Sequence, residues 1–443
     1  MKSNPTSLRA FQAASIPPEH GRDRRSWPSH APDLLNGLTA LCCAVVAAFV
    51  VCGTAIAQSG PAFTGLAATA ANAETVYLNP AGMTRLPGMQ FSVAPQIAYY
   101  NNEFRILPGS TEGAGTSIKD SGFGGIPSVA LSYQVNDRWW AGIGLTVPVG
   151  FGSEWPDDWA GRYIVQESTY AAVAATPSLA YRVNDRFSIG ASVNLNYIYA
   201  ETRAAINNAP DALPDGRVEY EGDGIGVGGT LSFLFEPSQR TRFGLVYRSK
   251  SETDVEGTPE FTNLGPLRQF VFQQLGILGA PVTTVSTTPQ SVGAGVYHEL
   301  SDDWSLTADI VWADFSEFGF SEVTVGDTTI AVNSSFDDIW AGSLGVKRAI
   351  NEKWAVSGGV MHATAGADAQ SRTLSLLLDR IWGVGIGADY ALSEKKDLSF
   401  SLTYLDLGDS YIDTQPTPLS GRVVGEFDHR YAILLGLNYA IRF

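Results

Sequence analysis

The stretch FSIGASVNLNYIYA, residues 187–200, alternates with a period of two, and the rest of the chain can be interpreted from it. One set of alternate positions carries Phe187, Ile189, Ala191, Val193, Leu195, Tyr197 and Tyr199, and the other carries Ser188, Gly190, Ser192, Asn194 and Asn196. Successive side chains of a strand point to opposite faces, so this segment predicts a strand with one apolar face and one small or polar face. The segment WSLTADIVWADF, residues 304–315, repeats the pattern.

Segments of this kind recur from Met89 to the C-terminus and are separated by two sorts of connection. Short turns rich in Asn, Asp, Pro and Ser lie at 135–139, 183–187, 236–241, 300–304, 350–354 and 392–397. Longer connections lie near 101–123, 151–169, 201–221, 253–288, 326–336, 365–378 and 409–427. Thirteen connections in which short and long alternate predict fourteen antiparallel strands.

The composition favours a membrane wall over a soluble sandwich. Only 17% of residues are charged, 11% are aromatic, 46 are glycine, and mean hydropathy is +0.01. This mixture suits a wall that is wet on one face and apolar on the other, whereas a soluble β-sandwich would not gather Trp and Tyr at its strand ends. We therefore expect an all-β fold, a 14-stranded antiparallel transmembrane β-barrel spanning residues 89–443.

The C-terminal strand YAILLGLNYAIRF, residues 431–443, strengthens this interpretation. Phe443, Ile441, Tyr439, Leu437 and Leu435 are expected to face lipid, while Arg442, Ala440, Asn438 and Gly436 face the lumen. A terminal aromatic residue on such a strand resembles the signal that the barrel-assembly machinery of Gram-negative outer membranes reads. We expect that machinery and outer-membrane lipid as partners.

Residues 1–57 are predicted to be a signal peptide. Arg22, Arg24 and Arg25 precede an apolar run that ends in TAIAQ, and Ala55 and Ala57 have the spacing that a signal peptidase reads. A membrane anchor is the alternative, and the small residues at the end of the run favour cleavage. All three cysteines lie in this leader, and its removal changes the net charge from −16 to −18. Nucleic acid is excluded as a partner because it requires basic surface.

Motifs for catalysis or metal binding are absent from the sequence. The glycine-rich stretches 222–229 and 383–389 lie in alternating strands and open no helix, so they lack the geometry of a phosphate-binding loop. His298, His362 and His429 have no metal-ligand spacing. We expect no enzyme activity, no cofactor and no metal. Acidic pairs at loop ends are read as solvated charge, with cation-bridged contact to lipopolysaccharide as the alternative.

The long connection 253–288 is unusually apolar for an exposed loop. Its apolar side chains are Phe270, Phe272, Leu275, Ile277 and Leu278. Exposed apolar patches mark binding surfaces, so these residues are candidates for ligand capture, and packing of the loop against the barrel mouth is the equal alternative. Trp155 and Trp159 in the connection 151–169 are further candidates, either as part of an apolar entrance to the barrel or as aromatic girdle residues at the membrane interface.

Several segments together resemble the FadL/TodX family of outer-membrane transporters of hydrophobic compounds. They include ETVYLNPAGMTRLPG (74–88), EWPDDWAGRY (154–163), FEPSQRTRFGLVYRSK (235–250) and DRIWGVGIGADYALSEKKDLSFSLTYLDLGD (379–409). The resemblance extends from about Gly60 to Phe443 and implies fourteen strands with a small N-terminal hatch in the lumen, here residues 58–88. This chain departs from the family in having a short hatch.

The resemblance also implies a route for ligand. The Asn79-Pro80-Ala81 turn of the hatch is expected beside an irregular third strand around Gly144–Pro148, where the wall opens sideways. Physically, proline cannot donate to a strand ladder, so Pro148 fits an interrupted wall. Without the resemblance, Asn-Pro-Ala would be no more than a turn before the first strand.

The leading interpretation is a passive outer-membrane channel for long-chain fatty acids or related hydrophobic molecules. A carboxylate ligand requires a cation near its pocket, and Arg162, Arg203 and Arg380 are the candidates, with ordinary ion pairing as the alternative for each. Uptake of aromatic hydrocarbons is the closest alternative function. An adhesin-like barrel or a general porin is a further one, disfavoured by the apolar connection and the hatch.

Overall fold

Fourteen long antiparallel strands form the described part of the chain. The computed structural model describes residues 61–326, 328–331, 336–367, 372, 374, 379–414 and 420–443, so the predicted signal peptide lies outside the described residues. In chain order the strands are β1 (Met89–Val93) with β2 (Gln96–Ile106), β3 (Ser117–Ile126) with β4 (Val129–Gln134), β5 (Trp139–Glu154), β6 (Glu167–Asn184), β7 (Phe187–Ile206), β8 (Gly216–Ser238), β9 (Thr241–Arg248) with β10 (Ser251–Gly257) and β11 (Glu260–Thr262), β12 (Val282–Thr288) with β13 (Ser291–Glu299), β14 (Trp304–Ala313) with β15 (Gly319–Val325), β16 (Thr328–Ala331) with β17 (Ile339–Ala349), β18 (Trp354–Ala363), β19 (Ile381–Ser393), β20 (Lys396–Asp406) with β21 (Ser410–Asp413), and β22 (Val424–Arg442). The predicted fold class is confirmed.

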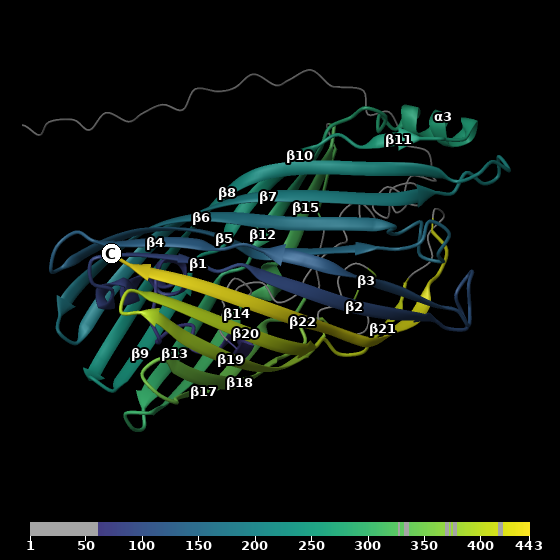
Figure 1. Cartoon of the computed structure of the whole chain (residues 1–443). Helices are drawn as coiled ribbons and strands as arrows, with labels where there is room; N and C mark the ends of the chain where they lie inside the picture. Colours follow the sequence, from purple (N-terminus) through teal and green to yellow (C-terminus); the bar gives the residue numbers. More distant parts are fainter. Residues whose placement is uncertain are drawn as a thin grey trace, which may run out of the picture.

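The sheet closes on itself. β22 pairs with β20 on one side and with β1 and β2 on the other, from Gln90↔Arg442 to Ile106↔Gly425. Figure 1 shows the strands wrapping into a barrel whose short turns lie at the end that also holds the C-terminus. Closure leaves no open sheet edge in the hydrocarbon layer. Among the described residues, no helix has the length and hydrophobicity needed to cross a membrane.

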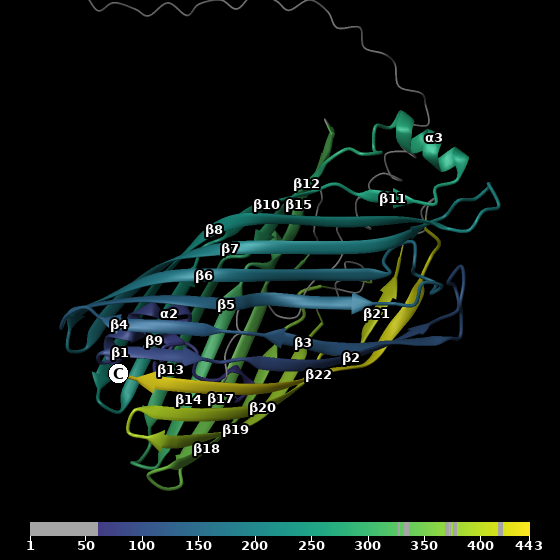
Figure 2. The same ribbon diagram turned by 45° about the horizontal axis from the view of Figure 1, so that its top comes forward.

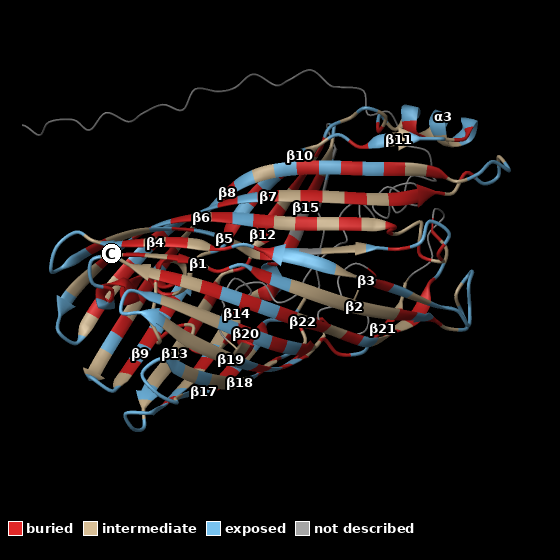
Figure 3. Ribbon diagram, in the orientation of Figure 1, coloured by how far each residue is buried: buried red, intermediate tan, exposed pale blue. Residues whose placement is uncertain are grey.

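Burial follows the predicted alternation along the strands, as the bands of Figure 3 show. In β22, Leu435 and Leu437 are exposed while Gly436 and Asn438 are buried, as expected from the sequence. Aromatic residues form belts at both ends of the outer face, such as Trp304 and Trp312 on β14. These two tryptophans are eight positions apart, which is about 27 Å along the strand and matches a tilted strand crossing an apolar band.

The strands extend further than the sequence pattern predicts. The predicted loop 253–288 contains most of β10, all of β11, the helix α3 (Pro266–Gln274) and β12. The period of two continues through β10, but Glu252, Asp254 and Glu256 replace apolar residues on the outer face. Because only the outward side chains change from apolar to charged, the ladder continues above the apolar band. In Figures 1 and 2 these strands and α3 project beyond the rest of the barrel.

The N-terminal segment, residues 61–88, lies inside the barrel at the end where the short turns are (Figure 2). It contains η1 (Pro61–Phe63), α2 (Thr75–Leu78) and η2 (Pro80–Arg85). Its backbone amides donate to inward side chains on different sides of the wall: Ala62 N to Thr403 Oγ1 at 3.0 Å, Gly65 N to Asp309 Oδ2 at 2.6 Å, and Ala81 N to Ser232 Oγ at 3.0 Å.

Inward-facing glycines let this segment approach the wall closely. A Cβ at Gly190 would overlap the backbone of Pro80 and Ala81, and one at Gly385 would lie 2.6 Å from the Ala62 nitrogen. The small residues on the inner face of these strands are therefore the contact surface for the N-terminal segment. In the sequence they occupy the small or polar positions that alternate with the apolar ones.

Candidate ligand site in the barrel

An apolar cavity of about 440 Å³ lies inside the barrel below the long loops. Its lining comes from the third and fourth barrel strands, from β2 and β3, and from β20 and β22, and its apolar members include Phe63, Ile126, Val147, Tyr170, Leu405 and Leu434. Cavities of this size that are largely apolar with a few polar groups are typical of small-molecule sites.

One buried cation, Arg430 on β22, lines this cavity. Only 8% of Arg430 is exposed. The guanidinium donates from Nη1 to the Leu407 carbonyl at 2.9 Å and to Ser410 Oγ at 3.4 Å, and from Nε to Asn102 Oδ1 at 3.3 Å. No carboxylate oxygen of the described residues lies within 4.0 Å of it. These neutral partners satisfy its hydrogen bonds, while Asp379, Asp406 and Asp409 act on its charge only from beyond ion-pair distance. A carboxylate ligand could therefore supply the direct anionic partner that the guanidinium lacks among the described residues.

Two further donors beside the cavity have no partner among the described residues. They are the indole nitrogen of Trp155 and the hydroxyl of Ser168, both in buried residues that line the cavity. A buried polar group without a hydrogen bond costs about 1–3 kcal/mol. The cavity therefore combines a large apolar lining with three donors, which is the arrangement that an amphipathic acid requires.

The barrel wall is interrupted next to this cavity. β5 pairs with β4 only as far as Val129↔Leu145, and beyond that residue its ladder runs on one side only, to β6. The register of the β5–β6 ladder shifts between Thr146 and Val149, on either side of Pro148, which has no N–H to donate. β3 pairs with β2 but not with β5. The predicted irregularity of the third strand is thus present in the ladder.

The gap between β3 and β5 is lined by residues with little bulk. A Cβ added at Gly124 or Gly125 would have no atom within 4 Å, and both glycines line the cavity. Phe123, also on the lining, is 78% exposed on the outside of the wall. The cavity therefore reaches the interruption in the wall.

The Asn79-Pro80-Ala81 turn does not lie beside this gap, and the prediction of its neighbours was wrong. Asn79 donates from Nδ2 to the Ala67 carbonyl at 2.5 Å and to the Phe233 carbonyl at 3.3 Å, and Pro80 and Ala81 pack against β7 and β8. The residue of the N-terminal segment that contacts Gly144 is Tyr77 of α2. The Asn-Pro turn ends α2 and starts η2, so it directs the chain from β5 toward β7 and β8.

The apolar side chains of the 253–288 connection mostly pack on one another. Phe272 and Ile277 are buried in a small core with Ile206 and Val218 at the ends of β7 and β8. Leu275 and Leu278 pack against the same core. Phe270 differs, since 60% of it is exposed. Self-packing explains four of the five predicted capture residues, and Phe270 is the one that faces solvent.

Trp155 and Trp159 form a roof over the cavity. Their rings stack at 5.0 Å, and both are buried in a cluster with Phe104 and Phe427. Trp155 lines the cavity itself, and the Trp159 indole donates to the Val165 carbonyl at 2.7 Å. Neither tryptophan therefore lies on the outer girdle.

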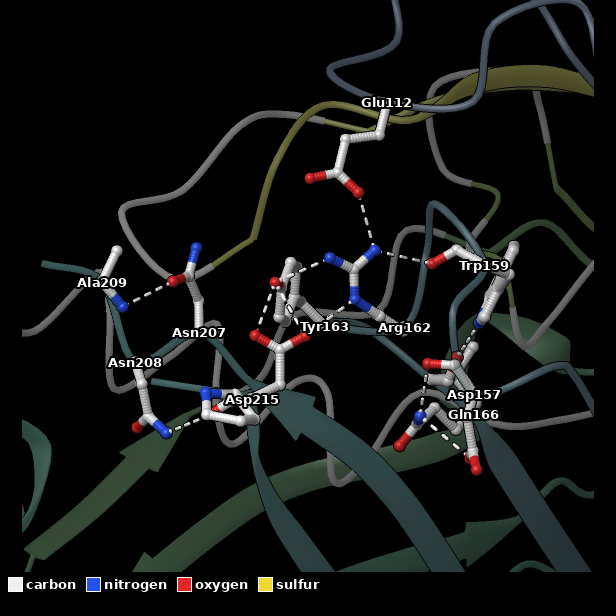
Figure 4. Close-up of polar contacts among 12 residues, drawn as sticks. Glu112, Asp157, Trp159, Arg162, Tyr163, Gln166, Asn207, Asn208, Ala209 and Asp215 are labelled. Atoms are coloured by element: carbon white, nitrogen blue, oxygen red, sulfur yellow. Dashed lines mark hydrogen bonds and ion pairs between the residues drawn. The ribbon is translucent and has the colours of Figure 1, made fainter. Parts of the chain in front are cut away.

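The three predicted arginines are engaged in ion pairs at the loop end of the barrel. Arg162 reaches Glu112 at 2.7 Å and Asp215 at 2.9 Å, which joins three external loops, as Figure 4 shows. Arg203 pairs with Glu167 at 3.0 Å and Arg380 with Asp406 at 3.4 Å. None of the three lines the large cavity.

The Arg162 network also fixes Tyr163. Its hydroxyl lies 2.9 Å from the Asp215 carboxylate (Figure 4). Burial and this hydrogen bond raise the pKa of Tyr163 to about 12. The network therefore holds the roof loops together rather than presenting a free cation to a ligand.

Arg430 was not among the residues predicted from the sequence, although the sequence contains a signal for it. Counting back from Phe443, position 430 has the same parity as Asn438 and Gly436, which were assigned to the lumen. A charged residue at a lumen position of the last strand was therefore visible. Its lack of an acidic partner was not, because that depends on residues of β2, β20 and β21.

The sequence is similar to outer-membrane transport proteins over most of its length. The family model described as outer membrane protein transport protein (OMPP1/FadL/TodX) matches residues 38–443. The long-chain fatty acid transport protein of Salmonella typhi is 24% identical over 414 residues, covering 87% of this chain and 91% of that protein. The 47 kDa outer membrane protein of Pasteurella multocida is 25% identical over 421 residues, covering 90% and 95%.

Solved structures share the fold. A FadL homologue from Pseudomonas aeruginosa superposes with a TM-score of 0.78 at 18% identity, over 89% of this chain and 99% of that one. The toluene transporter TodX of P. putida gives a TM-score of 0.61 at 15% identity, over 84% and 94%.

Proposed function

The chain belongs to the OMPP1/FadL/TodX family of outer-membrane transport proteins and is a channel for hydrophobic substrates, and we propose that its substrate is a long-chain fatty acid. The observation that carries the proposal is Arg430, a buried cation without a carboxylate partner among the described residues, on the lining of a 440 Å³ apolar cavity. The acid binds with its carboxylate on Arg430, Trp155 and Ser168. Its alkyl chain lies against Phe63, Val147 and Leu434.

The ligand leaves sideways through the gap between β3 and β5. A hydrophobic molecule gains about 25 cal/mol per Å² of apolar surface kept out of water. A path down an aqueous lumen would forfeit this gain, while a lateral exit from the cavity into lipid retains it. The N-terminal segment serves as a hatch that closes the lumen below the cavity, because its backbone is bonded to several sides of the wall.

Capture at the cell surface is assigned to the projecting part of the barrel. Phe270 on α3 is exposed, and Leu267 on the same helix and Leu213 in the neighbouring loop are exposed too. These three side chains offer a first apolar contact to a ligand that arrives from outside.

Aromatic hydrocarbon uptake is the alternative substrate class, and the aromatic lining of the cavity favours it. Tyr100, Phe123, Trp155, Tyr170 and Phe427 all contribute to that lining. Hydrocarbons have no anionic group for Arg430, however, so they leave it without a direct acidic partner.

The test is binding of isotope-labelled oleate to the purified protein and to Arg430→Met. Loss of charge-assisted hydrogen bonds, worth about 1.5–3 kcal/mol, predicts a 10- to 150-fold weaker Kd. Arg380→Met, which removes a cation from an ion pair outside the cavity, serves as the matched control and should bind as the parent does. Equal oleate binding by both variants, or tight binding of toluene that excludes oleate and ignores Arg430, would show that the acid is not the substrate.

A further inference from the structure

A second, smaller cavity lies beside the N-terminal segment. Its volume is about 110 Å³, and it is bounded by the C-terminal end of α2, by the irregular part of β5, by β6 to β10, and by β12 and β13. Apolar members of its lining include Val149, Phe315 and Phe318. Polar members include Asn196, Arg248 and Ser291. The cavity therefore offers both apolar and polar groups to a ligand.

Arg248, the last residue of β9, supplies a positive charge to this lining. Its Nη2 donates to the Tyr77 carbonyl at 3.1 Å and to the Leu78 carbonyl at 3.0 Å. No carboxylate oxygen within the described ranges lies within 4.0 Å of its nitrogens. The two carbonyls accept hydrogen bonds but carry no compensating charge, so the site retains a net attraction for an anion.

Ser291, at the start of β13, is a second and independent feature of the same cavity. The residue is only 1% exposed, it lines the cavity, and its hydroxyl has no partner in the part of the chain that the structure describes. Buried hydroxyls are normally hydrogen-bonded. An unpartnered O–H beside an uncompensated guanidinium is a pair of donors suited to a carboxylate.

Arg242 on the same strand shows what a structural arginine looks like in this wall. It donates from Nε to the Ala68 carbonyl at 3.2 Å, and its guanidinium lies 3.7 Å from the centre of the Tyr297 ring. It thus also binds the N-terminal segment, but it lines neither cavity. An arginine of β9 can thus bind the N-terminal segment without lining a cavity, so this binding alone does not explain why Arg248 lines one.

We propose that the cavity at Arg248 is a second carboxylate site, specific for hydrophobic acids shorter than those of the large cavity. The carboxylate binds Arg248 and Ser291, and the short chain packs against Val149, Phe315 and Phe318. Its ligand class rests on the proposed function, since both sites take hydrophobic acids. The size difference between the two cavities, 110 against 440 Å³, sets the difference in chain length.

The experiment measures binding of isotope-labelled octanoate and, in parallel, of labelled oleate to the purified protein in detergent. Arg248→Met should weaken octanoate binding by about tenfold or more and leave the Arg430-dependent oleate site unchanged. Arg248→Lys should retain most of the affinity because it keeps the charge. Ser291→Ala removes only the hydroxyl, disturbs the fold least, and should weaken octanoate binding severalfold.

Arg242→Met is the matched control, because it removes a bond to the N-terminal segment without touching the cavity. Octanoate binding that ignores both Arg248→Met and Ser291→Ala, or that falls equally in Arg242→Met, would overturn the second site. If either of these octanoate results is obtained while oleate binding depends on Arg430, the proposed function stands and only the second site is refuted. If neither acid binds the parent protein, both proposals fail.

Discussion

A disulfide between α2 and the third barrel strand tests whether transport requires the N-terminal segment to move. A Cβ at Gly144 would lie 3.5 Å from the Tyr77 Cβ, within the range that disulfides span. The double substitution Tyr77→Cys with Gly144→Cys removes the ring that would otherwise clash and should oxidise readily. All three native cysteines lie in residues 1–57, so Cys42→Ser, Cys43→Ser and Cys52→Ser in the same variant remove every competing thiol.

The expected stabilisation follows from the length of the closed loop. Joining positions 77 and 144 closes a loop of about 68 residues, which lowers the entropy of the unfolded chain by an amount equivalent to about 4 kcal/mol. The free energy of unfolding of the oxidised variant should exceed that of its reduced form by up to this amount. Urea titration of the protein in lipid vesicles, with and without reductant, measures the difference.

The effect on uptake separates two mechanisms. The large cavity reaches the gap between β3 and β5, and no residue of α2 or η2 contributes to its lining. Cells that carry the oxidised variant should therefore take up labelled oleate at the parent rate, and Tyr77→Cys alone controls for loss of the ring. Failure to form the disulfide would refute the contact. A fall in uptake that reductant restores would refute a fixed segment and show that α2 has to move.

Three further outcomes are expected. In Gly190→Ala the added methyl group would overlap the backbone of Pro80 and Ala81, so the N-terminal segment should be displaced and ion conductance in planar bilayers should rise. Gly124→Ala, where the methyl group meets open space, should leave the conductance unchanged. Equal conductance of the two variants would mean that the segment does not seal the lumen. Folding raises the pKa of Tyr163 from 10.0 to about 12, so the stability it contributes is complete below pH 10 and is lost as the pH rises through 12; Trp159 fluorescence should report this loss, and Tyr163→Phe should abolish it. Edman sequencing of outer-membrane protein should begin at Gln58, and an earlier residue would refute cleavage after Ala57.

The sequence by itself determined the barrel, because the information is local. A strand's two faces are set by alternate residues, so the lipid side and the lumen side of β7, β14 and β22 follow from a period of two. Turn residues mark where each strand reverses, which is why fourteen strands could be counted. Boundaries at the loop end were less accurate, because β10 continues the period after its outward residues change from apolar to acidic.

Tertiary structure alone decided which residues form the sites. Every predicted arginine proved to be paired with an acid from a neighbouring strand or loop. The two arginines that line the cavities without a direct acidic partner among the described residues are Arg430 and Arg248, whose surroundings come from strands far apart in the chain. Asn79-Pro80-Ala81 was expected beside β5 and lies against β7 and β8, while Tyr77 contacts Gly144. Charge compensation and the docking of a segment inside a lumen depend on distances between elements, and a pattern along one strand carries no information about its neighbours across the barrel.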